Sequence, residues 1–217
     1  MMNKIILKDS DILEGVDYSG KSTALDIMLR IHPYNYYTLE ITPDERKRLH
    51  GLDSPERFKE FMKYNQKLYA KAVTDNNPCG VLFERLWPST IAYHNMLLDK
   101  RLELDPEVND QLLAMPVNRI ILVTADESAI KRRMMKRQPA HKHESDPKYL
   151  CAVQDEYLRL LNYFHETMHI PFVVIDNSSD NVKDLEIWGR CGYRSNRAGA
   201  LCAVYAAGRG CGRRGLH

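Results

Sequence analysis

The stretch LEGVDYSGKST, residues 13–23, contains two glycines five residues apart, followed by a lysine and a serine. Its spacing is G-x-x-x-x-G-K-[ST], formed by Gly15, Gly20, Lys21 and Ser22. An apolar segment precedes it and a segment of helical periodicity follows it, which is the setting of a phosphate-binding turn. Backbone N–H groups and a helix N-terminus attract phosphate, the lysine adds a charge, and the serine hydroxyl can ligate Mg²⁺. The sequence therefore predicts a nucleotide-phosphate site.

Apolar segments of strand length alternate with segments of helical periodicity. The predicted strands are 12–13, 36–41, 81–83, 120–124 and 172–175, and residues 5–7 form either an edge strand or an extension of the first strand. The predicted helices are 22–31, 54–74, 90–104, 126–137 and 147–168, with a last one from about 179 to 188. Such alternation is typical of an α/β fold with a parallel sheet.

The composition indicates a soluble globular protein. Charged residues make up 28% of the 217 residues, and no segment has the roughly 18 consecutive apolar residues of a membrane span. The first residues lack the apolar run of a signal peptide. The five cysteines form no C-x-x-C pair and their number is odd, so we expect a reducing cytoplasm rather than a disulfide framework.

Residues 189–217 have a different composition from the rest of the chain. They contain six arginines and no lysine, aspartate or glutamate, whereas residues 1–188 carry a net charge of −4. We therefore predict one domain at 1–188 followed by a tail outside its core, with room for a short helix at 200–207. An arm that binds nucleic acid is the functional alternative to an extension without a role.

A second motif, HETMH at residues 165–169, matches the H-E-x-x-H pattern of zinc peptidases. Pro171 and a predicted buried strand follow it at once, and no third ligand is evident in the sequence. Solvated helix residues are therefore the favoured interpretation of His165, Glu166 and His169.

The stretch FERLWPSTIAYH, residues 83–94, begins at the end of the third predicted strand. An acid followed by an arginine at the carboxyl end of a parallel strand lies at the crevice where such sheets bind ligands. Glu84 and Arg85 therefore join the phosphate turn as candidate site residues.

Together these stretches resemble the thymidylate kinase family of nucleoside monophosphate kinases. That family's turn reads E-G-x-D-x-S-G-K-S-T, and its second motif reads D-R-x-x-x-S-x-x-A-[YF]. The first is matched by Glu14, Gly15, Asp17, Ser19, Gly20, Lys21, Ser22 and Thr23, and the second by Arg85, Ser89, Ala92 and Tyr93, with Glu84 in place of aspartate. Residues 129–137 resemble the start of its arginine-bearing lid, at about 133–148, and residues 171–188 resemble its closing strand and helix.

The resemblance implies a five-stranded parallel sheet flanked by helices, with ATP and Mg²⁺ on the donor side. The donor would lie on the turn, formed by Gly15, Val16, Asp17, Tyr18, Ser19, Gly20, Lys21, Ser22 and Thr23, with Mg²⁺ near Ser22 and Glu84. Arg133 and Arg137 would close over the transferring phosphoryl group. The family also commonly forms homodimers.

On the acceptor side the resemblance implies a deoxynucleoside monophosphate, with thymidylate as the first candidate. Arg85 would hold its phosphate, Asp17 its 3′-hydroxyl, and Tyr93 would crowd the 2′ position. The rest of the predicted acceptor site is Glu40, Phe61, Asn65, Gln66, Ser89 and His94, of which Phe61 would stack on the base. Asn65 stands where the family carries an arginine that reads thymine, with Gln66 beside it, and His94 stands where glutamine is common. The choice of base therefore stays open.

A deoxynucleoside kinase is the alternative. These enzymes share the fold and carry E-R where this chain has Glu84 and Arg85, and they need a general base, for which Glu40 is the candidate. Against this, they usually carry Asn-Ile where the turn has Val16 and Asp17. A GTP-dependent switch protein is disfavoured because the sequence lacks N-K-x-D and a D-x-x-G after the turn.

Overall fold

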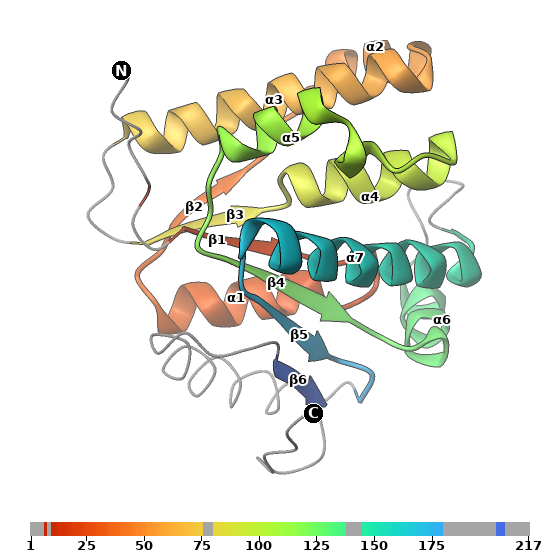
Figure 1. The fold of residues 1–217 in the computed structure, drawn as a ribbon. Helices are drawn as coiled ribbons and strands as arrows, with labels where there is room; N and C mark the ends of the chain where they lie inside the picture. Colours follow the sequence, from red (N-terminus) through yellow and green to blue (C-terminus); the bar gives the residue numbers. More distant parts are fainter. Residues whose placement is uncertain (1–6, 8–9, 76–79, 138–144, 180–202, 207–217) are drawn as a thin grey trace.

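Six parallel strands form one sheet at the centre of the protein (Figure 1). The computed structural model describes residues 7, 10–75, 80–137, 145–179 and 203–206. The strand order is β2-β3-β1-β4-β5-β6. The strands are β1 (Ser10–Glu14), β2 (Asn35–Thr38), β3 (Val81–Glu84), β4 (Arg119–Thr124), β5 (Phe172–Asp176) and β6 (Ala203–Ala206).

Helices cover both faces of the sheet. They are α1 (Lys21–Ile31), α2 (Pro43–Gly51), α3 (Ser54–Thr74), α4 (Trp87–Leu98), η1 (Leu102–Leu104), α5 (Pro106–Leu113), α6 (Glu127–Lys136) and α7 (Pro147–Met168). Successive strand residues point to opposite faces, so Leu13 packs with α1 whereas Ile12 packs with α3, α4, α5 and α7. Figure 1 shows these two layers, with α1 on the opposite side of the central strands from α3, α4 and α7.

The strands β1 to β5 and the long helices predicted from the sequence are confirmed, with shifts of one to three residues at most ends; α3 and α7 have the predicted bounds. The possible strand at 5–7 lies mostly outside the described residues. The predicted helix 90–104 is wrong in extent: α4 ends at Leu98, because Asp99 adopts a left-handed conformation (φ 48°). Helices α2 and α5 were missed, although both begin at capping residues. Thr42 forms a capping box with Glu45, and Asp105 accepts from the Glu107 N–H.

The sheet has a sixth strand where the sequence allowed a short helix. Strand β6 pairs in parallel with β5, from Val173 opposite Ala203 to Asp176 opposite Ala206. The open edge of β5 offers unpaired backbone groups, and Val204 and Tyr205 are residue types that favour strands. Part of the predicted lid, 138–144, and nearly all of the predicted last helix lie outside the described residues.

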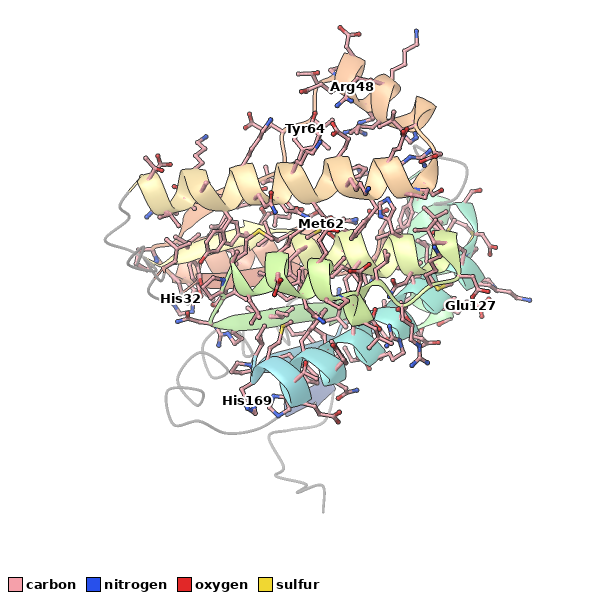
Figure 2. All side chains as sticks on the ribbon, turned by 45° about the horizontal axis from the view of Figure 1, so that its top comes forward. His32, Arg48, Met62, Tyr64, Glu127 and His169 are labelled. Atoms are coloured by element: carbon pink, nitrogen blue, oxygen red, sulfur yellow. The ribbon has the colours of Figure 1, made fainter. Side chains whose placement is uncertain are left out.

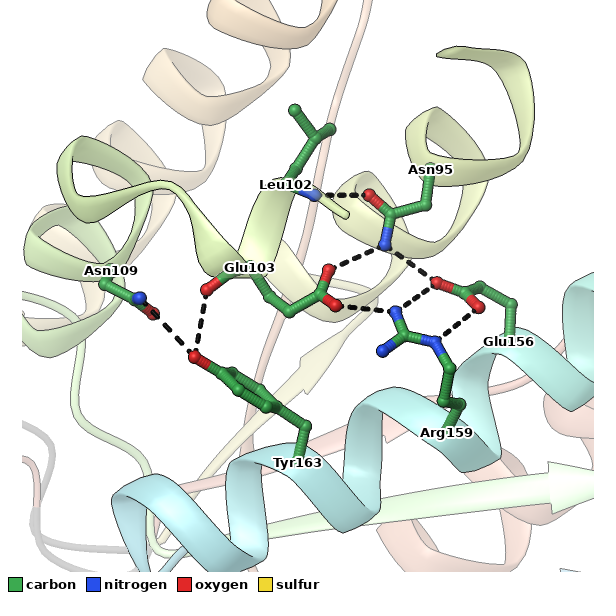
Figure 3. A network of polar contacts seen from close by, with 7 residues as sticks. All are labelled: Asn95, Leu102, Glu103, Asn109, Glu156, Arg159 and Tyr163. Atoms are coloured by element: carbon green, nitrogen blue, oxygen red, sulfur yellow. Dashed lines mark hydrogen bonds and ion pairs between the residues drawn. The ribbon is translucent and has the colours of Figure 1, made fainter. Parts of the chain in front are cut away.

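A network of polar side chains fixes the far end of α4 against α7 (Figure 3). The Asn95 amide donates to Glu103 Oε2 at 2.8 Å and to Glu156 Oε1 at 2.7 Å. Arg159 Nη2 lies 2.7 Å from Glu103 Oε1, and the Tyr163 hydroxyl donates to the Glu103 carbonyl at 3.1 Å. Because Glu103 is fully buried, this pairing stabilises the position of α4, the helix that carries the predicted acceptor residues.

None of the helices in the described parts of the chain combines the length and the apolar character that a membrane crossing requires.

Candidate active site

The phosphate turn links β1 to α1 and requires both of its glycines. Gly15 has φ 155° and Gly20 has φ 93°, which favour glycine. A Cβ on Gly15 would lie 2.7 Å from Ser19 Oγ and from the Val123 carbonyl oxygen, and one on Gly20 would lie 1.9 Å from Asn177 Nδ2. The Ser19 hydroxyl is buried without a hydrogen-bond partner among the described residues. The turn therefore fits a phosphate ligand, which would bring acceptor oxygens to this surface.

Lys21 and Glu84 form an ion pair beside the turn. Lys21 Nζ donates to Glu84 Oε1, and the Tyr36 hydroxyl donates to Glu84 Oε2. Burial opposes ionisation of Glu84, but these two bonds outweigh it and lower its pKa. Glu84 is therefore a carboxylate at neutral pH. Tyr36 was not among the predicted site residues; its only sequence signal is its place in a strand next to β3.

Ser22 and Glu84 supply the oxygen ligands that Mg²⁺ prefers. Ser22 is exposed in the first turn of α1, and Glu84 ends β3 on the same edge of the sheet. Mg²⁺ commonly takes one or two protein oxygens and completes its shell with phosphate and water. The residues present thus fit a magnesium ion brought in with a nucleotide.

Arg85 directs its guanidinium at the turn from the end of β3. Its N–H donates to the Leu13 carbonyl at 3.1 Å, and its φ of 60° is left-handed. Arg85 Nη2 lies 2.9 Å from Asp17 Oδ1, and the guanidinium carbon lies 5.7 Å from the centroid of the Tyr93 ring. Asp17, Arg85 and Tyr93, which were predicted together, are therefore in contact. The left-handed backbone of Arg85 is a separate indication, because a non-glycine residue in this conformation carries strain of about 1–3 kcal/mol and such strain clusters at functional sites.

Glu14 was matched in the sequence but given no role, and the structure places it where the end of β1 meets α4 and α7. Its side chain is fully buried at the end of β1. Oε1 accepts from the N–H groups of Leu86 and Ser89 at the start of α4, and Oε2 accepts from the Tyr157 hydroxyl of α7 at 3.0 Å. Burial raises its pKa from 4.5 to about 7, although Arg85 and these bonds oppose the rise.

This raised pKa predicts a pH-dependent stability. Because the folded state binds the Glu14 proton more tightly than the unfolded state, the contribution is complete below pH 4.5 and is lost as the pH rises through 7. A rise of this size is worth about 3 kcal/mol. Chemical unfolding across this pH range should show Glu14→Gln gaining stability relative to wild type above pH 7, because the amide carries no charge to bury.

Glu60→Gln is the matched control for that measurement. Glu60 is hydrogen-bonded to Lys63 and Arg48 at the surface, which lowers its pKa to about 2. Its stabilisation is therefore present above pH 4.5 and lost as the pH falls, the opposite sign to Glu14. A Glu14→Gln difference that is flat between pH 4 and 8 would contradict the assignment.

The two predicted lid arginines lie in different surroundings. Arg133, on α6, donates to the Tyr18 carbonyl at 2.8 Å and to the Asn177 carbonyl. Asn177 in turn donates to the Ser19 carbonyl at 2.9 Å, so these contacts hold the backbone of the turn at Tyr18 and Ser19. Arg137 is exposed just past the end of α6. Asn177 was missed by the sequence analysis, where it appeared only as part of the closing strand.

The remaining predicted residues of the turn differ in burial and in backbone conformation. Val16 is buried in the core, Tyr18 has a left-handed φ of 64°, and Thr23 is exposed. On the predicted acceptor side, the Ser89 hydroxyl donates to the carbonyl of Leu86, the N-cap residue of α4, at 2.9 Å. Glu40 is exposed two residues past the end of β2.

Phe61, Asn65 and Gln66 lie on α3. Phe61 is half-buried with its ring 5.9 Å from the His94 ring, so this predicted pair is brought together. Asn65 is fully buried and donates to Thr90 Oγ1 at 2.8 Å, whereas Gln66 is half-buried.

The H-E-x-x-H histidines do not share a helix. Helix α7 ends at Met168, and His169 follows it with a left-handed φ of 56°, at the surface in Figure 2. His165 Nδ1 lies 3.3 Å from the Ile170 carbonyl, so the first histidine contacts the turn out of the helix. The part of the chain described here holds no cluster of three or more His, Cys, Asp or Glu residues suited to a metal ion.

Solved structures that superpose on this chain include two thymidylate kinases and a deoxyadenosine kinase. Thymidylate kinase from Candida albicans superposes with a TM-score of 0.67 at 16% identity, over 89% of this chain and 94% of that chain. Deoxyadenosine kinase from M. mycoides with bound dATP gives 0.61 at 16% identity, over 86% and 100%. Thymidylate kinase from Ehrlichia chaffeensis gives 0.58 at 17% identity, over 87% and 100%.

The chain has the fold of these kinases. The α/β kinase fold expected from the sequence is thereby confirmed. No protein-family model matches the chain, and no curated protein sequence matches it.

Proposed function

We propose that the protein transfers a phosphoryl group from ATP to a deoxynucleoside monophosphate. The observation that carries this is Arg85, whose guanidinium lies 2.9 Å from Asp17 in the phosphate turn and over the Tyr93 ring. A guanidinium binds phosphate oxygens with two parallel hydrogen bonds. An acceptor that already carries a phosphate therefore suits this position, and the adjacent turn suits the donor. A homodimer in a reducing cytoplasm is the setting we propose.

The chemistry asked of these side chains is positioning and charge neutralisation. A monophosphate is an anionic nucleophile and needs no base. Lys21 would neutralise charge on the donor phosphates, and Arg85 would hold the acceptor in line. Magnesium, held with Ser22 and Glu84, would supply further neutralisation of the phosphates. Arg133 would help to hold the phosphate turn in position, because it donates to the Tyr18 carbonyl at 2.8 Å.

A deoxynucleoside kinase is the second candidate. It is favoured by Glu84 beside Arg85, and a deoxyadenosine kinase is among the structures that superpose on this chain. A nucleoside 5′-hydroxyl must lose a proton, for which Glu40 would be the base. Glu40 is exposed and lies two residues beyond the end of β2. Glu84, by contrast, is bound to Lys21 of the phosphate turn.

A coupled assay decides between the two candidates by comparing each monophosphate with its own nucleoside. We expect the monophosphate to react faster, to require Mg²⁺ and ATP, and to be preferred at least about tenfold over its ribose counterpart because Tyr93 crowds the 2′ position. Glu40→Gln should then weaken catalysis only modestly. A faster nucleoside, together with loss of activity in Glu40→Gln, would transfer the assignment to the nucleoside kinase.

A further inference from the structure

Helix α4 has no capping side chain from its own sequence. Leu86 stands at its N-cap, where serine, threonine, aspartate and asparagine are preferred, and makes no side-chain capping bond. The first N–H groups of a helix have no partner within the helix, and leaving a buried one unpaired costs about 1–3 kcal/mol. Leu86 and Trp87 have no exposed surface, so α4 begins in the core. The start of this helix therefore needs an acceptor from elsewhere in the chain.

Glu14 supplies that acceptor from the end of β1. Its Oε1 atom accepts from the Leu86 N–H at 3.1 Å and from the Ser89 N–H at 3.3 Å. Pro88, which lies between these residues, has no N–H to satisfy. The Tyr157 hydroxyl donates to Oε2 at 3.0 Å and thereby orients the carboxylate. Glu14 thus caps α4 in place of a local residue.

The bond to the Leu86 N–H also bears on the backbone of Arg85. The Arg85 N–H donates to the Leu13 carbonyl at 3.1 Å, so β1 holds the N–H groups of two consecutive residues. The φ and ψ angles of Arg85 lie between these two N–H groups, and φ is 60°. Such strained conformations persist only where the surrounding structure fixes them. Glu14 therefore supplies one of two backbone contacts that keep Arg85 in its left-handed conformation.

The backbone of Arg85 in turn determines where its guanidinium lies. Nη2 is 2.9 Å from Asp17 Oδ1 in the phosphate turn, and the guanidinium carbon is 5.7 Å from the centroid of the Tyr93 ring on α4. A change of φ or ψ at residue 85 would move the guanidinium relative to both. A displacement of about 1 Å at a group that holds a reactant can cost about a hundredfold in rate.

We propose that Glu14 is a positioning residue for the acceptor. Its hydrogen bonds to the start of α4 hold the left-handed backbone of Arg85, and so place the guanidinium where it would bind the acceptor phosphate. This inference rests on the proposed function. The hydrogen bonds of the Glu14 side chain are what this role requires, since a charge without the right reach would not fix the Leu86 N–H.

Two substitutions of Glu14 separate its hydrogen bonds from its charge. Glu14→Gln keeps an oxygen that accepts from the Leu86 and Ser89 N–H groups, so kcat/KM for the acceptor should stay close to the wild-type value. Glu14→Asp keeps the charge but is one methylene shorter, so kcat/KM for the acceptor should fall at least about tenfold while the KM for ATP stays unchanged. The acceptor used is the fastest of dTMP, dCMP, dAMP and dGMP. A loss in Glu14→Gln at least as large as in Glu14→Asp, or no loss in either, would overturn the proposal.

Glu103→Asp is the matched control. Glu103 is also fully buried and also holds α4, but it accepts from Asn95 in the last turns of the helix (Figure 3). Asn95 lies nine residues beyond Leu86, or about 14 Å along the helix axis. The melting temperature of Glu103→Asp should therefore fall while its kcat/KM for the acceptor stays close to wild type. An acceptor loss equal to that of Glu14→Asp would overturn the specific role of Glu14.

A double-mutant cycle tests whether Glu14 acts through Arg85. Arg85→Ala removes the guanidinium that Glu14 is proposed to place, so adding Glu14→Asp to this variant should cause no further loss in kcat/KM for the acceptor. The melting temperature should still fall, because the cap of α4 is weakened in either background. An equal kinetic loss in both backgrounds would show that Glu14 acts on the fold as a whole, and would overturn the positioning role.

Amide hydrogen exchange separates this proposal from the proposed function, because it needs no turnover. Exchange at Leu86 should be faster in Glu14→Asp and unchanged in Glu14→Gln. Unchanged exchange in Glu14→Asp would overturn the positioning role even where monophosphates are phosphorylated. Faster exchange, with a matching loss of transfer to nucleosides that outpace monophosphates in the wild type, would overturn only the monophosphate assignment.

Tyr157→Phe decides the question if Glu14→Asp does not fold. It keeps the ring on α7 and removes the hydroxyl that orients the Glu14 carboxylate. Exchange at Leu86 should rise and kcat/KM for the acceptor should fall, with the KM for ATP unchanged. No change in either quantity would overturn the proposal.

Discussion

Lys21→Ala is expected to lower kcat at least about a hundredfold while the protein stays folded. Removing one donor that stabilises transition-state charge typically costs about 2.7–4 kcal/mol, and Lys21 is the side-chain cation of the phosphate turn. Its partner Glu84 keeps the hydrogen bond from Tyr36 and lies partly in solvent, so the variant leaves no isolated buried charge. The measurement is steady-state turnover with saturating ATP, together with the melting temperature.

Lys63→Ala is the control for this experiment. Lys63 also pairs with a glutamate, Glu60, at 2.8 Å, but the pair is exposed on α3. Exposed pairs of this kind contribute little, so both turnover and melting temperature should stay close to wild type. Wild-type turnover in Lys21→Ala would overturn the kinase assignment.

The phosphate turn was predictable because its chemistry is local. Gly15 and Gly20 are required by contacts within and beside the turn, and Lys21 and Ser22 follow from the spacing alone. The parallel sheet was predictable for a similar reason, since buried strands such as β4 are apolar throughout. The conformation of such residues depends mainly on residues nearby in the sequence, and for that reason the sequence predicts it.

Contacts between distant segments could not be predicted in this way. Glu14 accepts hydrogen bonds from Leu86 and Tyr157, which lie 72 and 143 residues further along the chain. Nothing near residue 14 in the sequence indicates these contacts. Tyr36 reaches Glu84 only because β2 lies beside β3. Strand β6 was missed for the same reason, because it depends on the free edge of β5 and not on a pattern of its own.

The orientation of His94 combines both cases. Its place in the acceptor motif was evident from the sequence, but the hydrogen-bonding role of Nε2 depends on the Thr90 carbonyl 2.7 Å from Nδ1. The sequence thus supplies the residue, whereas the hydrogen-bonding role of its ring comes from a contact within α4.

Arg85→Lys is expected to lower kcat/KM for the acceptor at least about tenfold and to leave the KM for ATP nearly unchanged. Arginine presents two parallel N–H donors to a phosphate, and lysine supplies only a point charge. The left-handed backbone at residue 85, with φ of 60°, penalises both side chains similarly, so the substitution tests the guanidinium and not the backbone. The loss of tenfold corresponds to about 1.4 kcal/mol of transition-state stabilisation.

Arg48→Lys is the matched control. Arg48 Nη2 pairs with Glu60 at 2.9 Å, the same separation as Arg85 from Asp17, but half of its side chain is exposed. Acceptor and ATP kinetics should therefore both stay at wild-type values in this variant. In Arg85→Lys, a rise confined to the KM for ATP would place the arginine on the donor side, and the acceptor phosphate would then need a different cation.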